Sequence, residues 1–216
     1  MRAAILALAL AAAAGSVAAH PHVFIDTGVE VIFDARGRAQ AIRIRWTYDE
    51  LFSLLVLQDR GLDADYDGVL TAEETAALRG FDMAWEPGFA GDTYALQAEV
   101  PLTLGPPTDW DAGLTDGRLW STHLRALAVP VDPAAGDLVV QSYDPGFYTA
   151  YSITGQPVLT GRADCSAQVW APDPAAADAI LQAALAEYAG AAVEADFPAV
   201  GHAYAEEVRV TCAAPR

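Results

Sequence analysis

Residues 63–74 carry oxygen-bearing side chains at the spacing of a calcium-binding loop. The segment reads Asp-Ala-Asp-Tyr-Asp-Gly-Val-Leu-Thr-Ala-Glu-Glu, with carboxylates at loop positions 1, 3, 5 and 12 and glycine at position 6, which is the EF-hand pattern. Ca²⁺ binds about six to eight oxygen atoms, so alternate residues of a tight loop must point inward. The predicted ligands are Asp63, Asp65, Asp67, Val69 through its carbonyl oxygen, Thr71 and Glu74.

The role predicted for this loop is structural. Helices are expected on both sides of it, and Ca²⁺ is abundant outside the cell, so a Kd of roughly 10⁻⁴–10⁻³ M suffices to hold the two helices together. In that arrangement Gly68 allows the sharp turn and Glu74 completes the coordination shell. The alternative is a solvated acidic turn that matches the pattern by chance.

The first nineteen residues have the features of a secretory signal peptide. Met1-Arg2 is a short positive start, an apolar alanine-rich stretch follows, and Val17-Ala18-Ala19 fits the small residues at a cleavage site. The alternative, a membrane anchor, needs about 20 apolar residues, and this run is shorter. We therefore expect an exported, periplasmic protein that begins at His20 and has no membrane span.

A second candidate metal site lies at this new amino terminus. His20 and His22 fall on the same side of an extended chain, and imidazole and amine nitrogens bind Ni, Co, Zn or Cu. Asp26 lies two further steps along that face and is the third predicted ligand. The alternative is a polar start to an edge strand. His123 and His202 are either further donors or ordinary structural histidines.

The composition favours cations as small partners. The chain has 216 residues, a formal net charge of -17 and 53% hydrophobic residues. This excess of acid repels phosphate backbones and anionic lipid, so nucleic acid is excluded as a partner class. The length suits one domain, which we expect to span residues 20–216.

Two cysteines, Cys165 and Cys212, lie in the predicted mature part. An even count in an exported chain favours one disulfide that ties a carboxy-terminal strand to the rest of the domain. The alternative is a pair of buried free thiols.

Hydrophobic periodicity predicts an α+β fold with mostly antiparallel strands, a helix-loop-helix insertion around residues 63–74 and a carboxy-terminal helix. Residues 23–33 and 39–47 are the two strands of a predicted hairpin, and residues 48–57 have helical spacing. A second short helix is predicted over residues 72–78, with Thr71 as its N-cap. Residues 105–117 are rich in Gly, Pro and Asp and are expected to be a turn region. The remaining predicted strands are 93–100, 101–104, 118–131, 137–143, 148–153, 167–169 and 206–212, with 118–131 and 137–143 as a hairpin, and the late helix lies within 172–190.

The chain resembles a bacterial family of exported proteins, domain of unknown function family 1007. The residues that carry the likeness are His20-Pro-His-Val-Phe-Ile-Asp26, Trp46-Thr-Tyr-Asp-Glu-Leu-Phe-Ser53, the 63–74 loop, Tyr143-Asp-Pro-Gly-Phe-Tyr148 and the segment 197–212. The family is often labelled the periplasmic component of an uncharacterised ABC-type transport system. The resemblance implies a metal-binding partner of nickel/cobalt-type transporters, with His20, His22 and Asp26, and also Asp49 and Asp144, as donors.

These observations predict a non-enzymatic periplasmic accessory protein of a transition-metal transport system, with a structural calcium site and no catalytic residues. One alternative is an exported enzyme that uses the amino-terminal histidines as a metal site. Another is the solute-binding subunit of an ABC transporter, although such subunits usually have two α/β lobes.

Overall fold

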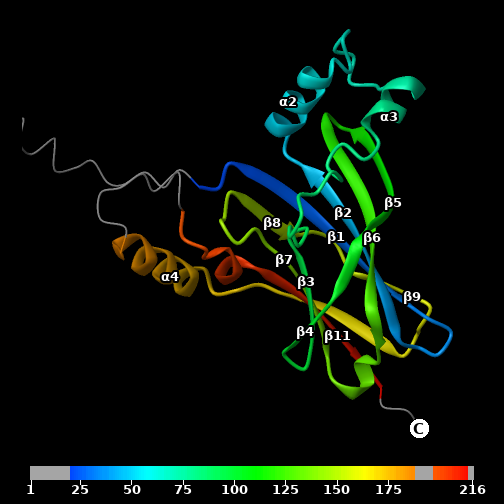
Figure 1. Cartoon of the computed structure of the whole chain (residues 1–216), viewed down its shortest axis with the longest axis vertical. Coiled ribbons are helices and arrows are strands. Elements are labelled where there is room, and N and C mark those ends of the chain that lie inside the picture. The colour runs from blue at the N-terminus through cyan, green and yellow to red at the C-terminus, as the bar shows by residue number, and fades with distance from the viewer. Residues whose placement is uncertain (1–19, 188–196, 214–216) are drawn as a thin grey trace, which may run out of the picture.

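The computed structural model describes residues 20–187 and 197–213, and the predicted signal peptide lies outside them (Figure 1). Two β-sheets enclose one hydrophobic core. The first sheet has the strand order β5-β6-β2-β1-β8, with β9 also paired to β1, and the second has the order β10-β11-β7-β3-β4. Among the described residues, no helix is long and apolar enough to cross a membrane.

In chain order the elements are β1 (Val23–Phe33), β2 (Ala39–Tyr48), α2 (Glu50–Arg60), α3 (Ala72–Leu78), β3 (Thr93–Gln97), β4 (Val100–Leu102), β5 (Leu104–Thr115), β6 (Arg118–Val131), the short 3₁₀ helix η1 (Pro133–Ala135), β7 (Leu138–Ser142), β8 (Thr149–Ile153), β9 (Val158–Thr160), β10 (Cys165–Trp170), α4 (Pro174–Glu187), η2 (Gly201–Tyr204) and β11 (Glu206–Cys212). The mixed α+β class is confirmed, and strands dominate it.

The hairpin of β1 and β2 is confirmed, and its alternation places one face in the core. Val31, Ile42 and Ile44 are fully buried, whereas Arg43 and Arg45, which alternate with the two isoleucines on β2, lie on the outer face. Val140 and Val208 of the second sheet are also fully buried in the same hydrophobic cluster. The two sheets therefore pack their apolar faces against each other, as in a β-sandwich.

The helices α2 and α3 connect the first sheet to the second and lie together at one end of the molecule (Figure 1). Asp49 caps the amino terminus of α2 by accepting the Phe52 N–H at 2.8 Å. Gly61 ends this helix in the left-handed conformation with φ of 65°, which glycine adopts without steric cost. Thr71 caps α3, as its type and position predict. These caps fix where the loop between the helices begins and ends.

One predicted turn region is wrong. Residues 105–117 largely form β5, a strand of twelve residues, despite their Gly, Pro and Asp content. The strand lies at the edge of the first sheet, next to β6 alone, and an edge strand tolerates prolines that cannot donate to a ladder. The Gly, Pro and Asp content therefore pointed to a turn, although a strand with this composition is permitted at the edge of the sheet.

The predicted hairpin between residues 118–131 and 137–143 is also wrong. β6 pairs with β2 and β5 in the first sheet, whereas β7 pairs with β11 and β3 in the second. The intervening residues, which include η1, carry the chain from one sheet to the other. β8 and β9 run parallel to β1, so antiparallel pairing predominates without being complete. The strand β9 was not predicted.

The disulfide between Cys165 and Cys212 is present. The two residues are direct partners in the antiparallel ladder of β10 and β11. Since β10 is the edge strand of the second sheet, the bond fastens this edge to the next strand inward.

Candidate metal site in the loop between α2 and α3

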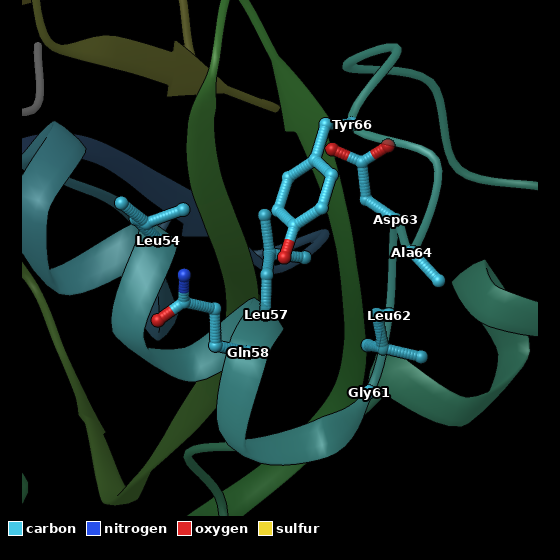
Figure 2. Close-up of a pocket in the computed structure, with 8 residues that line it drawn as sticks. All are labelled: Leu54, Leu57, Gln58, Gly61, Leu62, Asp63, Ala64 and Tyr66. Carbon is cyan, nitrogen blue, oxygen red and sulfur yellow. The ribbon is translucent and has the colours of Figure 1, made fainter.

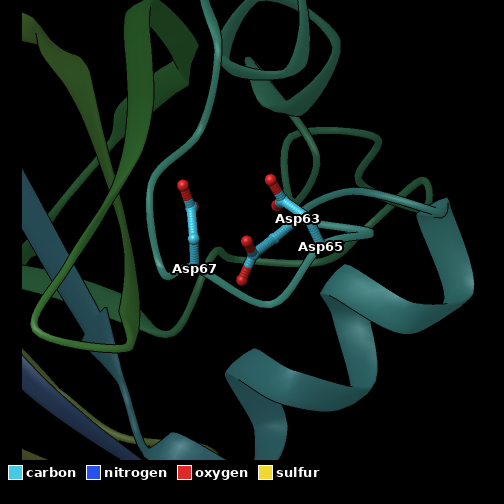
Figure 3. A group of neighbouring side chains, drawn as sticks. All are labelled: Asp63, Asp65 and Asp67. Atoms are coloured by element: carbon cyan, nitrogen blue, oxygen red, sulfur yellow. The ribbon is translucent and has the colours of Figure 1, made fainter.

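Three aspartates of the predicted loop converge. The carboxylates of Asp63, Asp65 and Asp67 each offer an oxygen atom within 4.8 Å of the others (Figure 3). Asp63 is buried, and Asp65 and Asp67 are exposed. Hard oxygen donors at this spacing are suited to a divalent cation such as Ca²⁺.

The backbone of the loop holds these side chains in place. Gly68 has φ of 76°, and a Cβ atom there would meet no other atom within 4 Å, so backbone conformation and not lack of space favours glycine. Its N–H donates to Asp63 Oδ1 at 3.2 Å, and the Val69 N–H donates to Asp67 Oδ1 at 2.8 Å. The turn thus orients two of the three carboxylates toward the inside of the loop.

Glu74 joins the two ends of the loop. Its Oε1 accepts the Asp63 N–H at 2.9 Å, and its Oε2 accepts the Thr71 N–H and the Thr71 hydroxyl, both at 2.9 Å. These hydrogen bonds, first those from Thr71 and then that from Asp63, lower the pKa of Glu74. The carboxylate is therefore ionised and next to Asp63, although it is engaged in the capping box of α3 and lies outside the group of three aspartates.

A groove of about 340 Å³ separates the loop from α2 (Figure 2). Leu54, Leu57 and Gln58 line it from the helix, and Asp63 and Tyr66 line it from the loop. Asp63 therefore lies where the helix and the loop meet, so a cation bound there would couple their positions.

His20 and His22 lie together, as their spacing predicts. Their ring centroids are 4.8 Å apart, His20 stacks on Phe197 at 4.1 Å, and His22 lies 4.8 Å from Tyr148. Two imidazoles at this separation are near enough to share an ion, and the rings of Phe197 and Tyr148 lie against them.

Asp26 is not brought to this histidine pair. Its carboxylate forms an ion pair with Arg118 at 2.8 Å, and these three residues do not form a metal-binding group in the part of the chain that the structure describes. The reason is distance along the strand, because Asp26 follows His22 by four residue steps of extended chain, a rise of about 13 Å.

The two carboxylates that the family resemblance offered as donors have structural roles. Asp49 caps α2 and also accepts the Phe24 N–H at 2.9 Å. Asp144 accepts the N–H groups of Gly146 and Thr149 at 2.8 and 3.0 Å, which closes the turn of the 143–148 motif. The aromatic residues of that motif pack against neighbouring rings, since Tyr143 stacks on Tyr94 at 4.1 Å.

His123 is a fully buried residue of β6 that lies between Trp46 and Trp85. Neither of its nitrogens has a hydrogen-bond partner among the described residues. Burial, with smaller contributions from Arg125 and Arg43, lowers its pKa from 6.5 to about 3. His123 is thus a neutral core residue and takes no part in the predicted metal sites.

We expect His123 to make the fold sensitive to acid. Because its pKa is lower in the folded state, its contribution to stability is complete above pH 6.5 and is lost as pH falls toward 3. The free energy of unfolding that is lost in this way between pH 7 and pH 5 is about 2 kcal/mol. Urea unfolding at these two values should show a smaller loss for His123→Leu than for the wild type. His202→Leu, at an exposed position, is the control. An equal loss in wild type and His123→Leu would contradict the assignment.

The fold and these sites define an α+β protein of two sheets whose helix-loop-helix segment carries a candidate metal site. The family model DUF1007, described as protein of unknown function, matches residues 5–212, and the chain belongs to that family. No curated protein matches the chain.

Proposed function

We propose that residues 63–74 form an EF-hand-like site for one structural Ca²⁺ ion. The observation that carries this proposal is the convergence of three aspartate carboxylates within 4.8 Å at loop positions 1, 3 and 5. The donors are all oxygen atoms, which favours Ca²⁺ or Mg²⁺ over softer metals. Ca²⁺ accepts an irregular shell of about six to eight ligands, as Val69 and Thr71 would help to supply, whereas Mg²⁺ demands near-ideal octahedral geometry.

To complete the coordination shell, the Glu74 carboxylate must give up its hydrogen bonds and bind the ion. The carboxylate already lies beside the Asp63 backbone, and in this proposal its side chain rotates to exchange N–H donors for the cation. Binding would then link α3, which begins just before Glu74, to the loop that leaves α2. The bound ion would thus hold α2 and α3 together.

Calorimetric titration of chelator-treated protein tests this proposal. We expect one Ca²⁺ per chain with a Kd of roughly 10⁻⁴–10⁻³ M and weaker binding of Mg²⁺. An absence of binding at millimolar Ca²⁺ would remove the proposal.

We further propose a periplasmic role in transition-metal handling, with His20 and His22 as donors for Ni, Co, Zn or Cu and a membrane metal transporter as partner. The separation of 4.8 Å between the two rings favours it, and so does the acidic charge, which raises the local cation concentration. The disulfide is compatible with export. In this proposal Asp26 keeps its ion pair and the remaining ligands come from the terminal amine and solvent.

Titration of the secreted, processed protein with Ni²⁺ and Cu²⁺ distinguishes this role from its alternatives. We expect His22→Ala to weaken binding at least tenfold, while His202→Ala leaves it unchanged, because only the former removes a donor from the pair. Unchanged binding in His22→Ala would exclude the site. Peroxide formation by the copper-loaded protein would favour an exported enzyme, and a solute bound without metal would favour a solute-binding subunit.

A further inference from the structure

Arg125 is a buried cation without an acidic partner. The residue is 5% exposed, and among the described residues no carboxylate lies within ion-pair distance of it. Nε donates to the Gly105 carbonyl and Nη1 donates to the Ala90 carbonyl at 2.9 Å. The guanidinium also lies 4.8 Å from the centre of the Trp85 ring. In a chain with 29 acidic residues, this isolation of a buried arginine calls for a physical reason.

The segment before β3 is shaped to hold this arginine. Gly91 has φ of 68°, and a Cβ atom there would lie 2.3 Å from Trp85 and 2.6 Å from Arg125 Nη1. Only glycine therefore lets the backbone pass this close to both side chains. The close approach places the Ala90 carbonyl on Arg125 and leaves Nη2 without a hydrogen bond to any described residue.

Arg125 lines a pocket of about 320 Å³ with mostly apolar walls. Tyr94 and Tyr143, stacked at 4.1 Å, form part of the wall together with Leu96. Thr93 also lines the pocket, and its buried hydroxyl oxygen has no hydrogen-bond partner among the described residues. Within the described part of the chain no aspartate or glutamate lines this pocket, whereas the pockets beside α2, beside Tyr204 and beside Glu99 each contain at least one.

We propose that this pocket binds a small organic anion, with its carboxylate on Arg125 and its apolar body between Tyr94 and Leu96. The planar guanidinium offers donors that match a carboxylate. A volume of this size, with apolar walls and few polar groups, is typical of small-molecule sites. The ligand would satisfy the buried charge that no side chain of the described protein satisfies. This site is independent of the two metal sites.

Three probes separate the charge from the apolar body: benzoate, benzyl alcohol and acetate. In NMR titrations of the wild type, we expect benzoate to shift the amide signals of residues 89–96. We also expect benzoate to bind at least tenfold more tightly than benzyl alcohol or acetate. Equal binding of benzoate and benzyl alcohol, or shifts elsewhere only, would overturn the proposal.

Variants test the residues directly. Arg125→Gln should weaken benzoate binding at least tenfold, and Arg45→Gln, which removes an arginine stacked on Trp120, should not change it. Because Arg125 is buried, its variant risks unfolding, so Tyr94→Ala provides a second test at a half-buried wall position. We expect at least a threefold loss of benzoate affinity in Tyr94→Ala with no loss for acetate. Unchanged benzoate affinity in this variant would contradict the pocket assignment.

Discussion

Replacing Glu74 with glutamine is expected to abolish most of the stabilisation that Ca²⁺ gives to the protein. With a Kd near 10⁻⁴ M, about 10 mM Ca²⁺ stabilises the wild type by about 2.7 kcal/mol. For a domain of this size, that free energy raises the melting temperature by about 5–10 °C. The side-chain amide of the Glu74→Gln variant offers one oxygen and no charge in place of a bidentate carboxylate, so we expect the affinity to fall at least a hundredfold, which is about 2.7 kcal/mol.

Glu73 provides the matched control. Glu73→Gln removes the same charge one residue away, at loop position 11, which carries no predicted ligand. Melting temperatures measured with Ca²⁺ and with chelator should differ in the wild type and in Glu73→Gln, but hardly at all in Glu74→Gln. Glu74→Gln also weakens the capping-box hydrogen bond, which lowers the melting temperature with and without Ca²⁺. Comparing the two conditions within each variant removes this effect. A full calcium response in Glu74→Gln would contradict the proposed ligand set.

Local patterns predicted the elements whose signals lie within one segment. The hairpin of β1 and β2 was predictable because its apolar residues alternate, and α3 because Thr71 is a favoured N-cap residue. β5 was not predictable, because the residues that permit an edge strand are those that also form turns. The partners of β6 and β7 depend on packing between the two sheets, which no local pattern records.

The same distinction applies to the candidate sites. The three aspartates of the loop are close in sequence, so their spacing alone brought them together in the prediction. The pocket around Arg125 combines the consecutive strands β3, β4 and β5 with β6 and β7, which follow farther along the chain. One signal was present nonetheless, since His123 and Arg125 share the parity of the buried Leu119 and Leu127 on β6. If the alternation is extended to include polar residues, it predicts that the side chains of His123 and Arg125 point into the interior.

Removing the disulfide is expected to produce the largest loss of stability. Cys165 and Cys212 are 47 residues apart, and closing a loop of that length in the unfolded chain corresponds to about 4 kcal/mol in the chain-entropy description. A double replacement, Cys165→Ala with Cys212→Ala, should therefore shift the urea midpoint strongly downward, with a steeper slope because the unfolded chain without the bond is less compact. Alanine avoids leaving a polar group at Cys212, which is 8% exposed.

The position of the bond indicates which part of the fold responds. β10 has β11 as its neighbour in the second sheet, so without the bond this edge is held by its ladder and by the packing of Ala167 against the core. Hydrogen exchange in the double variant should rise first in β10 and β11, while the hairpin of β1 and β2 stays protected. Reducing agent should destabilise the wild type and leave the variant unchanged, which separates loss of the bond from loss of side-chain packing. Equal stability of wild type and variant would contradict this prediction. It would mean that the ladder already fixes this edge and that residues 165–212 stay compact in the unfolded chain even without the bond.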